Sequence, residues 1–394
     1  MAFKRVRYFV FLKDIFGLAT TAFGGAQAHL AHFQRVLVKK RAYLSEQDLM
    51  EIYSLCQVLP GPTSTQVLTA VGFRVGGAWL AYLTLLVWAF PAVLVMTISG
   101  MVMAGLERKS LSMDFARFIQ PMAVGFVSYS AYTISLKTIH SKIGLMLMIL
   151  SGLVAYFIQS PFLFPFIILL AGLVTSFNYK DHPREEKDKF NIEWANFFLW
   201  AGVFLGAALL GHFTRALPIR LFENFYRNGS LIFGGGHMLT PLLYTEFVQY
   251  APKQYLTSEE FLSGYAISQA LPGPVFSFSA FVGGLSMREY GPFGEILGSF
   301  MAAAGIFLPG TFLIFFVIRF WEILKKYRVV RASIEGITAA SSGLVASAAI
   351  IMFQPLENNA INFGFTLGTF GLLAFTKIPP PLIIFGGLVL GLIL

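Results

Sequence analysis

The sequence predicts an all-α fold: a polytopic helical membrane protein with two inverted repeats, each carrying two broken or re-entrant helical hairpins. Three observations lead to this fold class. The 394 residues are 56% hydrophobic and 12% charged, with a mean hydropathy of +0.69, which is too apolar for a soluble domain. Mostly apolar runs recur that are long enough to cross a hydrocarbon core of roughly 30 Å. One set of motifs also occurs twice in the same order.

The doubled set consists of a Phe-Gly-Gly, a half-polar stretch that opens with Leu-Ser or Leu-Thr and acidic residues, and a Leu-Pro-Gly-Pro. The three motifs begin at Phe23, Leu44 and Leu59 in the first copy and at Phe233, Leu256 and Leu271 in the second. From the second glycine to the first proline the interval is 35 residues in one copy and 37 in the other. This agreement indicates an internal duplication, with a first repeat at 1–177, a polar linker at 178–193 and a second repeat at 194–394.

The first repeat begins with two interrupted segments. Residues 9–40 form an apolar run broken by Gly24 and Gly25, which is either one helix that crosses the membrane or a re-entrant hairpin with its tip at the glycines. Residues 46–76 form a second broken unit, because Pro60 and Pro62 remove backbone donors and prevent a continuous helix. Uninterrupted spans are predicted to follow at 79–105, 117–139, 142–159 and 161–177.

The second repeat comes after the polar linker and has the same plan after one additional span. That span is predicted at 194–215, and the two broken units are predicted at 219–250 and 258–287. The remaining spans are predicted at 292–320, 330–353, 361–376 and 379–394.

The distribution of lysine and arginine favours the re-entrant form of the Phe-Gly-Gly segments. In that form five spans separate the repeats, which are then inverted, and a cytoplasmic N-terminus places 21 of the 29 basic residues inside. If the segments cross, the repeats are parallel and the count is 16 inside and 13 outside. The positive-inside rule therefore favours inverted repeats in the cell (inner) membrane. Basic cytoplasmic loops also account for the net charge of +9, so we expect no nucleic-acid partner.

The broken segments predict a binding site near the membrane midplane. Interrupted helices at membrane depth persist only where protein or a wet cavity satisfies their backbone groups, and paired discontinuous segments in inverted halves mark a transporter's central site. Half-helices that start after Gly25, Pro62, Gly235 and Pro274 would direct free N–H groups and positive dipole ends toward an anion. Nearby hydroxyl and amide groups would add donors suited to a ligand with several oxygens, on Thr63, Ser64, Thr65 and Gln66 in the first half and on Ser277 and Ser279 in the second. The predicted substrate-binding residues are Gly24, Gly25, Gln57, Pro60, Gly61, Pro62, Thr63, Ser64, Thr65, Gly234, Gly235, His237, Gln269, Pro272, Gly273, Pro274 and Ser277.

Several residues near the breaks keep two interpretations. Gln57 and Gln269 stand directly before each break and either bridge the hairpins or contact the ligand. His29 and His237 come soon after the glycines and either bond to a neighbouring helix or supply a charge or donor to the ligand. The run from Thr63 to Thr65 also suits a helix cap, which is compatible with binding.

The ordered motifs resemble the chromate ion transporter family in its long, two-domain form, over nearly the whole chain. The resemblance implies export of chromate, a tetrahedral dianion similar to sulfate, by a secondary mechanism without a nucleotide-binding domain. The family motif residues fall on Phe23, Gly24, Gly25, Leu59, Pro60, Gly61 and Pro62, and on Phe233, Gly234, Gly235, Leu271, Pro272, Gly273 and Pro274. The second copy has Val275 and Phe276 where the first has Thr63 and Ser64, so the halves are not expected to contribute equally.

Other functions are less consistent with the sequence. A channel or transporter for another small inorganic anion is the main alternative, and a lipid-handling protein is a further one. No His-Glu-x-x-His or Gly-x-Ser-x-Gly motif occurs, so an enzyme is not expected. The single cysteine, Cys56, excludes a disulfide framework and a cysteine metal cluster, and no cofactor is expected. The expected partners are the anion, chromate or sulfate, and the lipid bilayer; a homodimer is compatible with the sequence.

Overall fold

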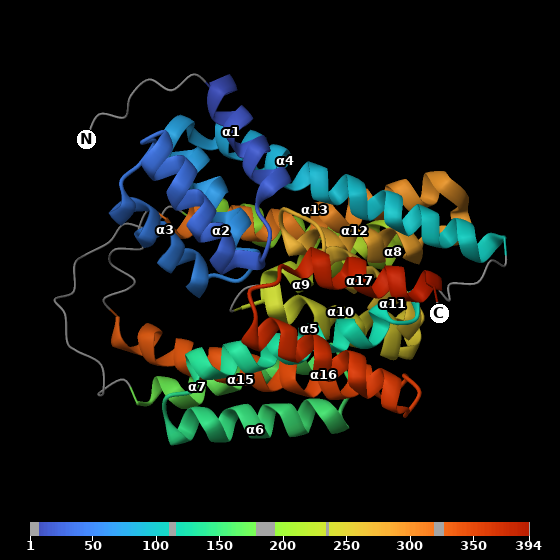
Figure 1. The fold of residues 1–394 in the computed structure, drawn as a ribbon. Coiled ribbons are helices and arrows are strands. Elements are labelled where there is room, and N and C mark those ends of the chain that lie inside the picture. Colours follow the sequence, from blue (N-terminus) through green and yellow to red (C-terminus); the bar gives the residue numbers. More distant parts are fainter. Residues whose placement is uncertain (1–7, 110–115, 179–193, 234–235, 319–326, 394) are drawn as a thin grey trace. The chain divides into compact units, whose positions relative to one another are not determined.

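The computed structural model describes residues 8–109, 116–178, 194–233, 236–318 and 327–393, which form helices and no strand (Figure 1). This confirms the all-α class. Three sequence predictions fall outside the described residues: the basic N-terminal residues, the polar linker after residue 178, and the predicted site residues Gly234 and Gly235.

The chain forms two compact units, and each draws on both halves of the sequence. Unit 1 comprises Met1–Gly105, Glu193–Gly236 and Leu271–Arg319, and unit 2 comprises Leu106–Ile192, His237–Ala270 and Phe320–Leu394. The units are therefore not the two sequence repeats, because each repeat contributes helices to both. The inverted relation of the repeats stays a prediction.

Unit 1 contains most of the interrupted segments. Its elements are α1 (Tyr8–Thr21), α2 (Gly25–Phe33), the π-helix η1 (Gln34–Lys40), α3 (Glu46–Val58), most of α4 (Thr63–Arg108), α8 (Ala195–Thr214), α9 (Leu217–Leu231), the 3-10 turn η7 (Val275–Ser277), α12 (Phe278–Ser286), the 3-10 turn η8 (Arg288–Tyr290) and α13 (Gly291–Val317). Helix α13 packs against α9, α12 and α8.

Both glycine-bounded breaks that precede a long span lie where the sequence predicts them. Helix α4 is interrupted at Gly76 and Gly77, and Gly77 has φ 76° and ψ −169°. In the second half Gly291, the first residue of α13, has nearly the same conformation, φ 69° and ψ −169°. Positive φ is accessible to glycine at little cost, so these residues end one helical piece and start the next.

Unit 2 is a helical bundle around α15. Its elements are α5 (Ile119–Thr138), α6 (Lys142–Phe157), α7 (Leu163–Ser176), α10 (Leu239–Tyr244), the π-helix η5 (Thr245–Gln249), the 3-10 turn η6 (Ala251–Lys253), α11 (Ser258–Gln269), α15 (Arg328–Phe353), α16 (Ala360–Phe375) and α17 (Pro380–Ile393). Helix α15 packs against α5, α6 and α7, and α16 packs against α5. The 3-10 turn η4 (Gly236–Met238) lies at the sequence boundary between the units.

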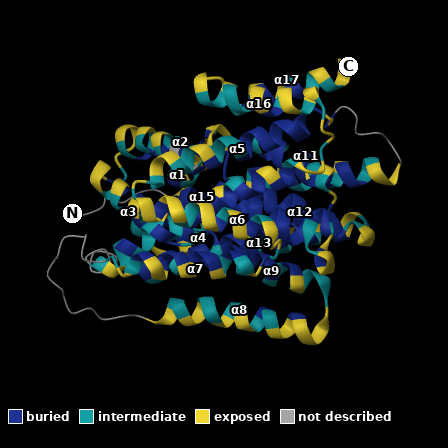
Figure 2. Ribbon diagram, turned by 90° about the horizontal axis from the view of Figure 1, so that it is seen from below, coloured by how far each residue is buried: buried dark blue, intermediate teal, exposed yellow. Residues whose placement is uncertain are grey.

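The outer helices present apolar side chains, as expected of a protein surrounded by lipid. Helix α6 exposes Leu145, Met146 and Ile149. Helix α8 is mainly exposed and intermediate in Figure 2, and its mean hydropathy suits a membrane span. By contrast α12, which is dark blue in Figure 2, buries the polar residues Ser279 and Ser286. Each predicted span coincides with one helix, and the helices are those of a multi-pass membrane protein.

The helices that lead to the two Leu-Pro-Gly-Pro turns begin in the same way. At α3 the Ser45 hydroxyl accepts a hydrogen bond from the Asp48 amide, and the Asp48 carboxylate accepts one from the Ser45 amide. Thr257 and Glu260 make the same reciprocal pair at α11. Such capping boxes satisfy two of the free amides at a helix start, so the half-polar stretches that accompany the motifs fix where these helices begin.

Candidate functional site

The interrupted tips in unit 1 are joined by two equivalent backbone hydrogen bonds. The Gly61 amide, in the first Leu-Pro-Gly-Pro turn, donates to the Ile232 carbonyl at 2.7 Å, and the Gly273 amide, in the second turn, donates to the Ala22 carbonyl at 2.9 Å. Ala22 and Ile232 each stand directly before a Phe-Gly-Gly. Each proline-rich turn is therefore bonded to the Phe-Gly-Gly segment of the opposite half.

Glycine is required at the centre of both turns. Gly61 has φ +121° and Gly273 has φ +95°, a region that side-chain-bearing residues rarely adopt. A Cβ at Gly61 would lie 3.1 Å from the Gly310 Cα, and one at Gly273 would lie 3.2 Å from the Ala19 carbonyl oxygen. Backbone therefore approaches backbone at both turns.

Helix α4 begins at the first turn with a run of buried polar residues. Its first helical hydrogen bond runs from the Gln66 amide to the Pro62 carbonyl at 2.9 Å, so the amides of Thr63, Ser64 and Thr65 precede it and have no helical partner. All three side chains are buried. The Thr65 hydroxyl accepts a hydrogen bond from the Trp88 indole N–H at 3.1 Å. These amides and hydroxyls form a concentration of donors at a positive helix end.

Gln66 stabilises this turn. Its side-chain amide donates to the Pro60 carbonyl at 2.8 Å and to the Gly310 carbonyl at 3.2 Å. Both of its N–H groups are thus occupied, and its side-chain oxygen is buried without a partner. Gln66 therefore fixes the turn against α13, and its amide is not a free donor for an anion.

The second turn leads into a more apolar segment. A 3-10 turn precedes α12, and the Ser277 amide donates to the Pro274 carbonyl at 3.0 Å. The Ser279 hydroxyl donates to the Phe276 carbonyl at 2.8 Å, and the Phe276 ring is buried with its centroid 6.4 Å from that of Phe307. The second turn is therefore followed by fewer free polar groups than the first, and the unequal contribution of the halves to binding stays a prediction.

The first Phe-Gly-Gly tip leads into α2. Gly24 and Gly25 have φ values of +92° and +76°. A Cβ at Gly24 would lie 2.9 Å from the Ala28 Cβ, whereas one at Gly25 would meet nothing within 4 Å. Open space therefore adjoins Gly25, at the start of this helix.

The other predicted site residues are divided between the two units. Pro60, Pro62, Pro272 and Pro274 flank the two bonded glycines within unit 1. Gln57 is exposed and interacts with Tyr53 on the same helix. His237 and Gln269 belong to unit 2, where His237 is exposed and lies within electrostatic reach of Lys137. The structure thus brings the two turns and the first Phe-Gly-Gly together in unit 1, whereas His237 and Gln269 are part of unit 2.

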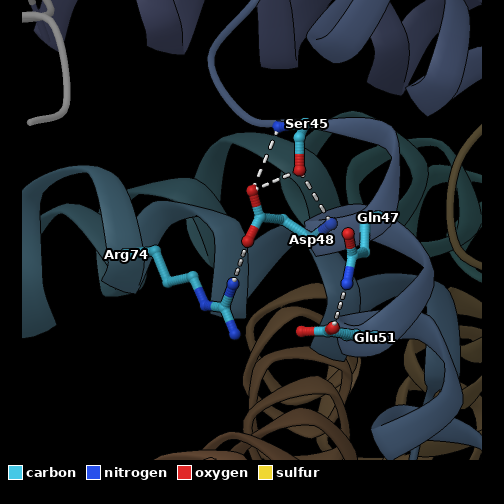
Figure 3. A network of polar contacts seen from close by, with 5 residues as sticks. All are labelled: Ser45, Gln47, Asp48, Glu51 and Arg74. Carbon is cyan, nitrogen blue, oxygen red and sulfur yellow. Dashed lines mark hydrogen bonds and ion pairs between the residues drawn. The ribbon is translucent and has the colours of Figure 1, made fainter. Parts of the chain in front are cut away.

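Two basic residues away from the tips, Arg41 and Arg74, are paired with carboxylates. Arg74 bonds to the Asp48 carboxylate at 3.0 Å (Figure 3), and the hydrogen bond from the Ser45 hydroxyl, with Arg74 as a further contributor, lowers the pKa of Asp48. Arg41 contacts Asp14 at 2.8 Å, which raises the pKa of Arg41. Each ion pair joins the two ends of one interrupted segment, at positions that are distant in sequence from its tip. In the described ranges no three His, Cys, Asp or Glu side chains are grouped so as to hold a metal ion.

Comparison with known proteins identifies the family. A family model described as chromate transporter matches residues 9–176 and 219–392. The chain belongs to the chromate transporter family. A chromate transport protein of Cupriavidus metallidurans is 24% identical over 380 residues, which cover 95% of this chain and 90% of the relative. A chromate transport protein of Pseudomonas aeruginosa is 24% identical over 357 residues, covering 87% and 80%.

A further relative is described only as an uncharacterized transporter. It comes from Methanocaldococcus jannaschii and is 25% identical over 340 residues, which cover 84% of this chain and 81% of the relative. No solved structure matches the chain. Membership of the chromate transporter family makes this a multi-pass membrane protein of an ion-transporting family. Its relatives named above are described as transporters or transport proteins.

Three residues at the tips lie outside the predicted set of substrate-binding residues, although the sequence suggests donor roles for Gln66 and His29. Trp88 bonds to Thr65, Gln66 fixes the first turn to α13, and His29 lies against Trp88 with a ring-centroid distance of 5.3 Å. His29 and Gln66 lie within one turn of a predicted helix start, and that spacing was the available signal. Trp88 belongs to a predicted span, where an aromatic residue is common, so no sequence signal separated it from its neighbours.

Proposed function

We propose that this protein is a secondary transporter of a tetrahedral oxyanion and exports chromate, with sulfate as a related substrate. The anion would be held at helix N-termini near the membrane midplane, chiefly by the start of α4. Named relatives described as chromate transport proteins support chromate as the substrate.

The start of α4 is the observation that carries this proposal. The amides of Thr63, Ser64 and Thr65 precede the first helical hydrogen bond and are buried beside their own hydroxyls. Within the described residues, the structure gives the Thr63 and Ser64 hydroxyls no hydrogen-bond partner. No lysine or arginine occurs between residues 57 and 73, so binding here would depend on amide and hydroxyl donors and the helix dipole.

A binding site made of uncharged donors suits a substrate that must be released after binding. Charge-assisted hydrogen bonds contribute about 1.5 to 3 kcal/mol each, so several of them can select an oxyanion without a fixed ion pair. The backbone bonds from Gly61 and Gly273 hold the two turns in place, which supports a preformed site.

The proposed topology rests on the charge distribution. We propose inverted repeats in the cell (inner) membrane with a cytoplasmic N-terminus, because this arrangement places 21 of the 29 basic residues inside.

Transport by inside-out vesicles tests the proposal. Vesicles that contain the protein should accumulate radiolabelled chromate in a saturable manner, sulfate should compete, and an imposed membrane potential or pH gradient should change the rate. Vesicles from cells without the protein serve as the control. Flux that rises linearly with concentration and ignores both gradients would favour the channel, and no flux of either anion would reject the proposal.

A further inference from the structure

His29 is a buried imidazole at the first Phe-Gly-Gly tip. Its exposed fraction is 1%, and neither ring nitrogen has a hydrogen-bond partner of ordinary geometry among the residues that the structure describes. The Ala22 carbonyl is the polar backbone group that acts on the ring most strongly. Buried polar side chains are nearly always hydrogen-bonded, so an unpartnered histidine at this depth requires an explanation.

The surroundings of His29 connect it to both proline-rich turns. The Ala22 carbonyl accepts the hydrogen bond from the Gly273 amide. The Trp88 ring meets His29 edge-on at 5.3 Å, and its indole N–H donates to the Thr65 hydroxyl at 3.1 Å. His29 is therefore connected through the Trp88 ring to the polar start of α4. It is connected through the Ala22 carbonyl to the second turn.

Few charged groups face the imidazole. The Ala22 carbonyl, directly after α1, and the Trp88 indole of α4 face it, while Phe33 lies one turn further along α2. Among the described residues, the titratable side chain with a resolved effect on it is His32, which is also a histidine. The surroundings thus contain no carboxylate with a resolved effect that would hold His29 in its charged form.

An anion at the tips would change the equilibrium between the neutral and the protonated forms of His29. A buried charge without a partner is costly, so the imidazole is favoured as neutral when the site is empty. A dianion nearby favours the imidazolium by direct attraction. By linkage, a proton on His29 must then favour the dianion by the same factor.

We propose that His29 takes up a proton when the oxyanion binds, so that proton binding and anion binding are coupled at this residue. The inference rests on the proposed function, because it needs an anion at the tips. It adds the group that carries the coupling: anion and proton bind together and are released together. The one bond formed is the second N–H bond of the imidazole, and its proton comes from the buffer acid in the solvent, which becomes its conjugate base.

Proton uptake on anion binding provides the test. Sulfate is titrated into the purified full-length protein by calorimetry, in buffers of different ionisation enthalpy, and the dependence of the heat on the buffer gives the number of protons taken up. Sulfate is the probe because it stays doubly charged between about pH 6 and pH 8, where histidine titrates. The wild type should take up about one proton per sulfate when the empty site is neutral. His29→Gln should take up none and bind more weakly at low pH.

His32→Gln is the matched control, because His32 lies one turn away on α2 and should keep the proton uptake. Equal uptake by His29→Gln and the wild type would overturn the inference. The wild type alone gives a second measurement that needs no variant. Its affinity for sulfate should increase about tenfold for each unit by which the pH falls, and an affinity that stays flat over this range also overturns the inference. Sulfate binding without proton uptake would leave the proposed function intact, whereas no binding in any buffer would reject the proposed function itself.

Discussion

The two Leu-Pro-Gly-Pro turns share a backbone conformation but differ in the segments that they lead into. Gly61 and Gly273 both have positive φ, and each donates its amide to the residue before a Phe-Gly-Gly. After the first turn an α-helix starts at once with Thr63 and Ser64. After the second, a 3-10 turn that includes Phe276 intervenes.

This difference separates two requirements of the site. The backbone arrangement depends on both copies, since each turn bonds to the opposite half. The polar lining is concentrated in the first copy. Substitutions in the backbone arrangement should therefore act alike in the two halves, and substitutions in the lining should not.

The largest effect is expected when a side chain is added to either central glycine. Gly61→Ala and Gly273→Ala place a Cβ at positive φ against backbone atoms, and such strain costs about 1 to 3 kcal/mol before any steric clash. Both variants should lose transport in vesicles and unfold at lower temperature. Gly202→Ala, where a Cβ meets nothing within 4 Å, is the control and should behave as wild type. Normal transport by either turn variant would show that its turn is not fixed as described.

The orientation of the halves is tested by labelling. Lys40→Cys and Gln254→Cys, on a Cys56→Ser background, occupy exposed positions that inverted repeats place on opposite sides of the membrane. Gln254 is preferable to Lys253, whose ammonium is paired with the buried Glu246 carboxylate. An impermeant maleimide should label Gln254→Cys in intact cells and Lys40→Cys only after the cells are opened. Equal labelling in intact cells would support parallel repeats.

An intermediate effect is expected from the hydroxyl groups of the lining. Thr63→Val or Ser64→Ala should raise the half-saturating chromate concentration by roughly ten- to a hundredfold, because a hydrogen bond to a charged ligand is lost. Ser279→Ala should change it less, since that hydroxyl already donates to the Phe276 carbonyl. Uptake kinetics at constant protein abundance measure the change. If first-turn variants lower abundance alone, these hydroxyls cap the helix and do not hold the anion.

The smallest effect is expected from the capping boxes, which are alike in the two halves. Ser45→Ala and Thr257→Ala should each lower stability by about 1 kcal/mol and leave the half-saturating concentration unchanged. The lowered pKa of Asp48 means that its contribution to stability is present above the ordinary carboxyl pKa and is lost as the pH falls through the lowered value. Asp48→Asn should remove this dependence in thermal unfolding at graded pH. A large change in affinity from either cap variant would contradict a purely structural role.

The sequence predicts the breaks better than the contacts. Proline and glycine act locally, through a missing amide or an accessible positive φ, so the interruptions at Gly24 and Pro60 could be placed from sequence alone. The bond from Gly61 to Ile232 joins positions far apart in the chain, and no local pattern encodes it. The duplication indicated that the tips should meet, but not that each turn would bond to the opposite half. For the same reason the two compact units could not be predicted, because helix packing does not follow sequence order.

The exchange of hydrogen bonds between halves also constrains how the protein is made. When the ribosome has completed the first half, Gly61 has no Ile232 to donate to, and Ala22 receives no bond from Gly273. Both tips must then remain open during synthesis until the second half has entered the membrane. Assembly of the site is therefore a late event that follows membrane insertion. A first half expressed alone would expose a turn without its hydrogen bond to the quality-control machinery of the membrane.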